Sequence, residues 1–197
     1  MTMTDFILTL ISAALINNLV LQLPLGVDPL LKATRHSDFT RSQVHALGIA
    51  TAWIMLSGTL ISYLLYRYLL MPLELTYLRL FVFLPVSVVL ITPCLSMLSR
   101  FLPRLPFDGL WPLLLGNAGI LGLALLSTQA DKGIFFTLAL SLGAGLGFWW
   151  VLSLFHDLRQ RIHTQDVPLP FRGMPIELIS AGLMGLAFLG FSGLVKP

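Results

Sequence analysis

Long apolar stretches separated by short polar segments run along the whole chain. A helix needs about 20 predominantly apolar residues to cross the ~30 Å hydrocarbon core of a bilayer. Six stretches reach or approach that length, at approximately residues 4–23, 44–66, 77–98, 107–126, 134–155 and 175–194. The connections leave no room for a separate soluble domain. The pattern therefore predicts an all-α integral membrane protein in which residues 1–197 form one six-span domain.

Composition agrees with the pattern. Of the 197 residues, 56% are hydrophobic and only 11% are charged, with a mean hydropathy of +0.88, whereas about a quarter of the residues in soluble domains are charged. The net charge is +3, but Lys and Arg are scattered over the loops and form no basic stripe. We therefore expect the lipid bilayer, and no nucleic acid, among the partners.

The basic residues also predict an orientation. The first, third and fifth loops carry eight of them: Lys32, Arg35, Arg41, Arg100, Arg104, Arg159, Arg161 and Arg172. The other side, with both termini and loops two and four, carries four: Arg67, Arg79, Lys132 and Lys196. Loops rich in Lys and Arg face the cytoplasm. We expect a multi-pass protein of the bacterial inner membrane with both termini in the periplasm.

The first span is interrupted by polar and helix-breaking residues. In "LINNLVLQLPLGVDPLL", residues 15–31, the adjacent amides Asn17 and Asn18 are followed by Pro24, Gly26 and Pro29. Proline stops a helix from continuing, and the backbone groups that a break releases cannot face lipid. Asparagine side chains can bond those groups. We therefore predict a broken helix in this span.

The fourth span repeats this pattern 100 residues later. "LGNAGIL", residues 115–121, sits in the same register as "LINNLVL", residues 15–21, because its Leu115, Asn117 and Leu121 match the Leu, Asn and Leu of the first segment. It also contains Gly116 and Gly119. Because three spans precede the fourth, the two halves would cross the membrane in opposite directions. The fold class expected is an inverted-topology repeat of three plus three spans, with broken half-helices in spans 1 and 4 that line a shared midplane site. The alternative is that these Asn and Gly residues only pack neighbouring helices.

Three further features bear on the function of the chain. Asp28 is either a costly buried carboxylate with a function or a helix-ending residue at the interface. Cys94, the single cysteine, excludes an intrachain disulfide and is expected to pack as a small apolar residue. "GAGLG", residues 143–147, follows no strand, so we expect it to pack helices and to bind no dinucleotide.

The sequence carries no complete catalytic or metal site. It contains no nucleophile elbow, phosphate loop or metalloprotease helix. The histidines have no spacing that would supply three ligands to a metal ion. We expect them to be solvated or interfacial; they are His36, His45, His156 and His163.

The motifs "INNLVL", "LGVDP", "YLRLFVFL" and "GNAGILGLALL", together with residues 166–197, resemble the RnfA/RsxA family. This family is the A subunit of the Rnf ion-translocating electron-transport complex and is related to the D and E subunits of the sodium-pumping NADH:quinone reductase. The resemblance covers essentially the whole chain. It implies a six-span subunit that pairs with a paralogous subunit of opposite orientation and works with other Rnf-type subunits. It also implies electron transfer between ferredoxin and NAD, coupled to Na⁺ or H⁺ translocation.

The resemblance implies a cofactor that this chain is not equipped to hold. In the family, one cysteine from each break joins two from the paralogue around a [2Fe–2S] cluster. Here those positions are Asp28 in "LGVDP" and Ala118 in "GNAGILG". Alanine has no ligating atom, and aspartate is uncommon on a cluster normally held by four thiolates. We therefore expect no cofactor bound in the usual way and a divergent subunit.

A second function from another class fits the same residues. A non-redox membrane scaffold or small transporter could keep the inverted-repeat fold without the electron route. Transport through half-helices would need only backbone carbonyls, amide side chains and Asp28.

Overall fold

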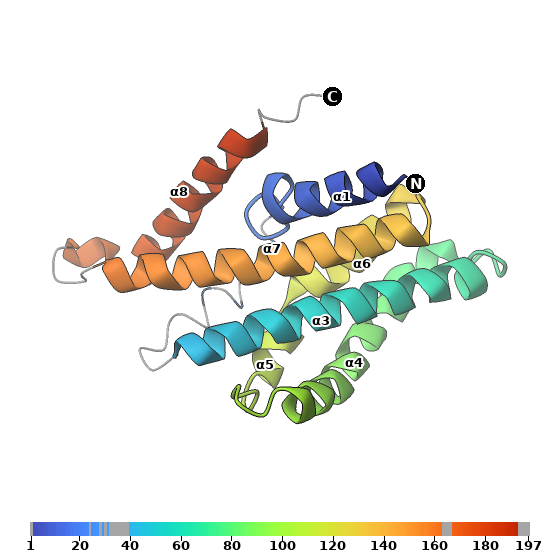
Figure 1. Ribbon diagram of the computed structural model, residues 1–197, viewed down its shortest axis with the longest axis horizontal. Helices are drawn as coiled ribbons and strands as arrows, with labels where there is room; N and C mark the ends of the chain where they lie inside the picture. The colour runs from blue at the N-terminus through green and yellow to red at the C-terminus, as the bar shows by residue number, and fades with distance from the viewer. Residues whose placement is uncertain are drawn as a thin grey trace.

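The structure, a computed structural model, describes residues 2–23, 25–27, 29, 31, 40–162 and 167–192, with side chains described up to residue 190. These residues are helical and contain no strand, so the all-α prediction is confirmed for them (Figure 1). The elements are α1 Met3–Ile11, the π-helix η1 Ser12–Ile16, α3 Arg41–Leu65, the π-helix η2 Tyr66–Leu70, η3 Thr76–Leu78, α4 Arg79–Phe101, α5 Trp111–Leu115, α6 Ala118–Ala130, α7 Ile134–Arg161, η4 Leu169–Phe171 and α8 Met174–Ser192.

The long helices α3 and α7 form the centre of the molecule. They run antiparallel and side by side, with α1 on the other side of α7 (Figure 1). Glycines allow this close approach, because a Cβ atom added to Gly145 would lie 2.8 Å from Ala52 Cα, and one added to Gly147 would lie 2.6 Å from Ala14 O. The prediction that "GAGLG" packs helices is confirmed.

Among the described residues, four helices are long and apolar enough to cross a membrane: Arg41–Leu70, Thr76–Phe101, Trp111–Ala130 and Ile134–Arg161. The remaining two predicted spans correspond to the shorter apolar helices Met3–Ile16 and Met174–Gly190. The first of them is short because the chain leaves the helix at Asn17 and continues in turns. The six-span prediction is thus met in part.

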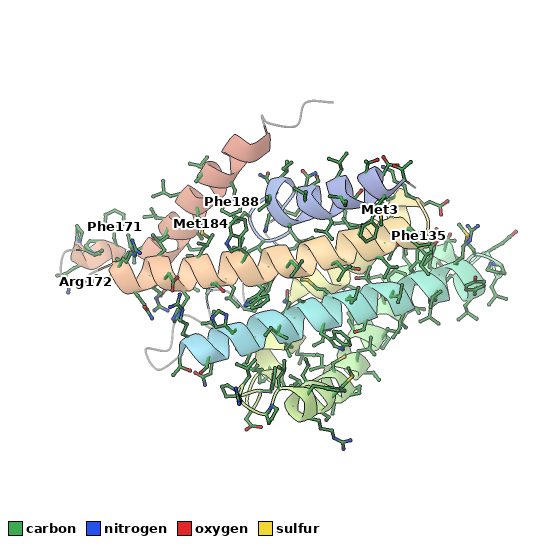
Figure 2. All side chains as sticks on the ribbon, in the orientation of Figure 1. Met3, Phe135, Phe171, Arg172, Met184 and Phe188 are labelled. Atoms are coloured by element: carbon green, nitrogen blue, oxygen red, sulfur yellow. The ribbon has the colours of Figure 1, made fainter. Side chains whose placement is uncertain are left out.

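Many large apolar side chains point away from the centre of the molecule. Phe81 is 74% exposed and Phe135 is 64% exposed. Met3 and Phe135 lie at one end, whereas Phe171 and Arg172 lie at the opposite end (Figure 2). A surface this apolar on helices of spanning length suits hydrocarbon or partner helices rather than water.

Helix α8 diverges from the rest of the molecule at an angle to α7 (Figure 1). Near its start, Glu177 is 5% exposed and its Oε1 lies 2.8 Å from Nη2 of Arg159 on α7. Further along, the rings of Phe188 and Trp150 meet edge to face with centroids 5.8 Å apart. The ion pair, whose carboxylate is buried, and the ring contact hold α8 against α7.

Candidate functional site

The first helix break begins with a widened turn. After α1 the chain continues as the π-helix η1, closed by a hydrogen bond of 2.7 Å from Asn17 N to Ser12 O. The π turn holds more residues than an α turn and therefore rotates the side chains that follow it. As a result Asn17 points away from the core, and its Nδ2 donates to Ser12 Oγ at 3.2 Å.

Asn18 joins the two sides of this break. Its side chain is fully buried, and Nδ2 donates to Ala14 O at 2.8 Å. Its Oδ1 accepts from the backbone N–H groups of Val20, at 3.0 Å, and Leu21, at 3.4 Å. One amide thus satisfies a carbonyl at the end of the helix and two donors in the following turn, as buried backbone groups require.

The second break is shorter. Helix α5 ends at Leu115 and α6 begins at Ala118, with Asn117 as N-cap. Oδ1 of Asn117 accepts from Gly119 N at 3.0 Å, which satisfies one of the unpaired donors at a helix start. The Nδ2 atom of Asn117 is buried and has no hydrogen-bond partner among the residues that the structure describes.

The two breaks meet inside the molecule. Gly26 has a φ of +87°, which favours glycine. A Cβ atom there would lie 3.0 Å from Asn117 Oδ1 and 3.2 Å from Phe148 Cε2. Likewise, a Cβ atom at Gly119 would lie 3.0 Å from Leu19 Cδ2. The glycines therefore let backbone and amide groups of two segments approach each other, although those segments are about a hundred residues apart in the sequence.

Ala118 lies on the outer side of the second break. It is exposed, like Gly116, and lines a surface depression of about 290 Å³ between the break and α4. The α4 side of this depression is formed by Leu84, Ser87, Val88 and Ile91. The break thus presents its buried amide to the first break and the methyl group of Ala118 to the surface.

The predicted site residues fall into three groups. Gly26, Asn117 and Gly119 gather where the breaks meet, and Asn18 and Pro29 are buried. The side chains on the outside are those of Asn17 and Ala118, with Gly116 beside Ala118. Pro24 and Asp28 lie outside the described residues, so the two interpretations of Asp28 both stay open.

The structure adds residues that the sequence did not single out. The ion pair of the buried Glu177 and the partly buried Arg159 borders a small cavity of about 100 Å³. The sequence signal for this ion pair was an acidic residue in the first turn of the last apolar stretch and an arginine at the end of the preceding apolar stretch. Phe148, which contacts Gly26 in the middle of α7, had no sequence signal that separates it from other core aromatics.

One expectation about the histidines was wrong. His156 is 6% exposed, and its Nε2 lies 2.9 Å from Nε2 of Gln160, one turn further along α7. It is buried because α7 packs this side into the core, and Gln160 supplies the polar partner that burial demands. His36 and His163 lie outside the described residues. Cys94 is buried in α4, as predicted.

Comparison with known proteins gives the family. The model of the family described as "Rnf-Nqr subunit, membrane protein" matches residues 6–195. The chain belongs to the Rnf-Nqr membrane subunit family. It is therefore a multi-pass membrane protein, in agreement with its apolar helices.

Individual relatives in the Rnf-Nqr family align over their full length. Each of them is named as the A subunit of an ion-translocating oxidoreductase complex. The relative from Actinobacillus pleuropneumoniae serotype 5b is 40% identical over 98% of this chain and 100% of its own length. Those from Pseudomonas paraeruginosa and Azotobacter vinelandii are 41% identical over 99% of this chain and 100% of each relative. The resemblance to this family stated from the sequence is thus confirmed.

The side chains at the second break do not fit the iron–sulfur cluster that the resemblance implies. Ala118 offers a methyl group, which has no lone pair for iron. Within the described part of the chain, no three His, Cys, Asp or Glu residues come together. Cys94 is buried in α4 with its Sγ 3.7 Å from Ser57 Oγ of α3, and it does not line the depression at Ala118.

Proposed function

We propose that this chain is the A subunit of an Rnf-type complex that couples electron transfer between ferredoxin and NAD to translocation of Na⁺ or H⁺. The observation that carries the proposal is the identity of 40% and 41% with proteins named as the A subunit of an ion-translocating oxidoreductase complex, over nearly the whole of both chains. The two breaks that meet at Gly26 and Asn117 support it, because paired discontinuous helices are typical of ion-translocating folds.

The proposal includes six membrane crossings in the inner membrane, arranged as an inverted repeat with periplasmic termini. The apolar helices α1 and α8 would supply the crossings beyond the four long ones. The excess of Lys and Arg in loops one, three and five supports cytoplasmic loops at those positions. Cysteine substitution at Thr2 and at Arg104, followed by labelling with an impermeant maleimide in intact cells, tests this topology. Labelling of Arg104→Cys without labelling of Thr2→Cys would contradict it.

A paralogous subunit of opposite orientation would cover the surface at Ala118. The depression there is open, and its walls on α4 are mostly apolar. Such a surface on a membrane helix suits the close approach of another helix. Photo-crosslinking from Ser87, which lines the depression, should capture that paralogue in native membranes.

We further propose that the chain contributes no ligand to a [2Fe–2S] cluster in the usual way. The methyl group of Ala118 supports this, since it replaces one of the two cysteines that the family would contribute. Analysis of iron and labile sulfide in the chain purified with its paralogue tests the proposal. We expect a substoichiometric content, and a stoichiometric [2Fe–2S] spectrum would contradict it.

Recovery of partners tests the function itself. A tagged chain expressed at its native level should bring down the remaining Rnf-type subunits from membranes solubilised in mild detergent. Recovery of none of them would contradict the proposal.

Ala118 also favours the alternative function, a non-redox scaffold or small transporter, because that function needs no cluster ligand at this position. Deletion of the gene separates the two functions. If the chain is needed for electron transfer, ferredoxin-dependent reduction of NAD⁺ by membranes falls on deletion. If that reduction is unchanged while the other subunits are still recovered with the tagged chain, the scaffold is the better description.

A further inference from the structure

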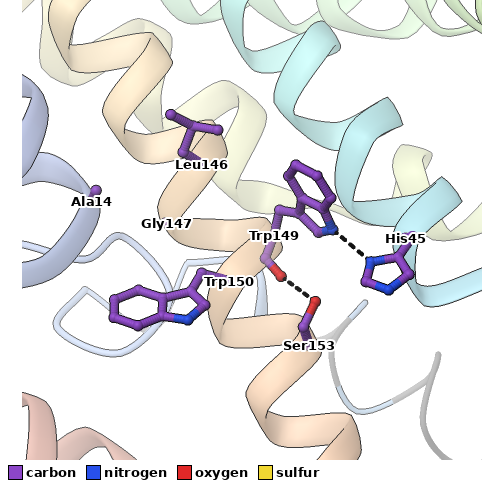
Figure 3. A pocket seen from close by; sticks show the side chains of 7 residues that line it. All are labelled: Ala14, His45, Leu146, Gly147, Trp149, Trp150 and Ser153. Atoms are coloured by element: carbon purple, nitrogen blue, oxygen red, sulfur yellow. Dashed lines mark hydrogen bonds between the residues drawn. The ribbon is translucent and has the colours of Figure 1, made fainter. Parts of the chain in front are cut away.

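A groove on the outer face of α7 is not used by the proposed function. It has a volume of about 490 Å³ and runs between η1 and α3, with α7 as its floor (Figure 3). Its walls are mainly apolar, and Leu146 and Trp150 line it while each being 45% exposed. The volume lies in the range of small-molecule sites.

Close packing fixes the shape of this groove. Trp149 Nε1 donates to His45 Nδ1 at 3.1 Å, and the two rings meet edge to face (Figure 3). Gly48 lies directly against the indole, so that an added Cβ would collide with Trp149 Cδ1. The hydrogen bond to His45 and the close contact with Gly48 thus hold the indole in place.

His45 lines the groove and carries a single hydrogen-bond donor. The indole N–H can only donate, so Nδ1 of His45 accepts and the proton of the neutral ring is on Nε2. Within the described part of the chain, Nε2 has no hydrogen-bond partner. A ligand that fits must therefore be largely apolar and must carry an acceptor oxygen near one end.

Two opposite charges lie one helical turn beyond the groove. Arg41 is four residues before His45 on α3, and Asp157 is four residues after Ser153 on α7. Their side chains meet at 3.3 Å and are 72% and 42% exposed. They can therefore contact a ligand group that carries both a negative and a positive charge.

The span from Leu146 in the groove to the charged pair beyond it is comparable to the depth of one leaflet. From Leu146 to Asp157 the helix α7 rises about 16 Å, which is about half of the ~30 Å hydrocarbon core. The apolar part would hold an acyl chain, and the charged pair would lie at the level of the headgroups.

We propose that this groove is a binding site for phosphatidylethanolamine. The acyl chain lies along Trp150 and Leu146, an ester or phosphate oxygen accepts from His45 Nε2, the phosphate contacts Arg41 and the ammonium contacts Asp157. A zwitterionic headgroup complements the pair of opposite charges, whereas an anionic one such as phosphatidylglycerol leaves Asp157 facing a negative charge.

Native mass spectrometry of the full chain in mild detergent, with palmitoyl-oleoyl phosphatidylethanolamine or phosphatidylglycerol added, tests this site. We expect one retained phosphatidylethanolamine. Ser153→Phe fills the groove and should weaken retention about ten-fold. Leu154→Phe, next to it but outside the groove lining, should leave retention unchanged. Equal retention by these two variants would overturn the proposal.

Two further comparisons test the polar contacts without filling the groove. Asp157→Asn should abolish the preference for phosphatidylethanolamine over phosphatidylglycerol, which we expect to be about five-fold in the wild type. His45→Gln keeps an acceptor for Trp149 and a donor for lipid, so it should retain more lipid than His45→Leu. Equal binding of both lipids by the wild type would overturn the headgroup assignment.

A different occupant would be visible in the assembled complex. With a photoreactive benzoylphenylalanine at Ser153, we expect crosslinks to lipid. Crosslinks to a segment of another subunit instead would overturn the proposal and would identify the groove as a protein interface.

Discussion

The two helix breaks use the same side chain for different purposes. In the first, Asn18 is fully buried and its amide bonds Ala14 O and the N–H groups of Val20 and Leu21. In the second, Asn117 caps α6 through Oδ1 only, and Nδ2 has no partner among the described residues. The first break is therefore closed by its own bonds, whereas the second keeps an unused donor beside an exposed Ala118.

The two breaks therefore have different roles, because the first stabilises the fold and the second faces the surface of the molecule. The first break joins η1 to the chain that leads to Gly26, and it ends against Asn117 and Phe148. The second break turns one side toward that support and the other toward a surface depression. We therefore expect stability to depend on the first break, and contacts with other subunits to depend on the second.

The largest expected effect is that of Asn18→Ala. It leaves a carbonyl and two N–H groups without partners in a buried site, which should lower the free energy of unfolding by about 3 kcal/mol. Asn17→Ala is the matched control, because the Asn17 side chain points outward and, among the described residues, donates to Ser12 alone; its cost should be about 0.5 kcal/mol. Unfolding of the purified chains in a denaturing detergent titration measures both. Equal losses would contradict the closed first break.

Gly26→Ala should have the next largest effect on stability. A Cβ at a φ of +87° is strained, and it would also press on Asn117 Oδ1, for a total of about 2 kcal/mol. Gly109→Ala has a similar φ of +77° but open space around it, so only the strain of about 1 kcal/mol remains. The thermal midpoints of the two variants give the difference. If the two variants lower the thermal midpoint equally, an added Cβ at residue 26 does not press on Asn117, which would contradict the close approach of the two breaks.

Two substitutions of Asn117 should differ in their effect on stability. Asn117→Ala removes the cap of α6 and should destabilise by about 1 kcal/mol. Asn117→Ser keeps an oxygen for Gly119 N and removes the unpartnered Nδ2, so the expected change is only a few tenths of a kcal/mol. The same unfolding titration compares them. A serine variant as unstable as the alanine variant would mean that Nδ2 has a stabilising role.

The smallest effect on stability is expected at Ala118. Ala118→Cys in a Cys94→Ala background should fold normally and should react with a maleimide at least about ten-fold faster than Ala124→Cys, since Ala124 is 3% exposed. Mass spectrometry of timed samples measures both rates. A slow Ala118→Cys in the isolated chain would contradict an outward-facing second break.

The sequence predicted where the two helix breaks lie, but it did not predict which residues of the two breaks correspond. Matching "LINNLVL" with "LGNAGIL" paired Asn17 with Asn117, yet Asn18 has the hydrogen-bonding role of Asn117, since each accepts from the N–H two residues further on. The π-helix over residues 12–16 explains the shift, because its wider turn rotates Asn17 outward. Two adjacent amides carry no local signal of which one is buried.

Other features depended on tertiary context. Phe148 and Gly26 come together only because α7 crosses the first break, and neither residue indicates that on its own. The ion pair of Arg159 and Glu177 joins the end of one helix to the start of another, so each residue alone resembles an ordinary interfacial charge. The close glycine packing of α7 was predictable, because a run of small residues in an apolar span has few other uses.

We propose above all that the chain keeps the scaffold of its family without that family's cluster ligands. Electron paramagnetic resonance of the dithionite-reduced complex tests it most directly, with the wild-type chain compared with an Asp28→Cys/Ala118→Cys variant and with Ser87→Cys as the control thiol in the same depression. We predict a [2Fe–2S] signal only in the double cysteine variant, whose two thiolates complete the set of four with those of the paralogue. A signal of equal intensity in the wild type would contradict this claim.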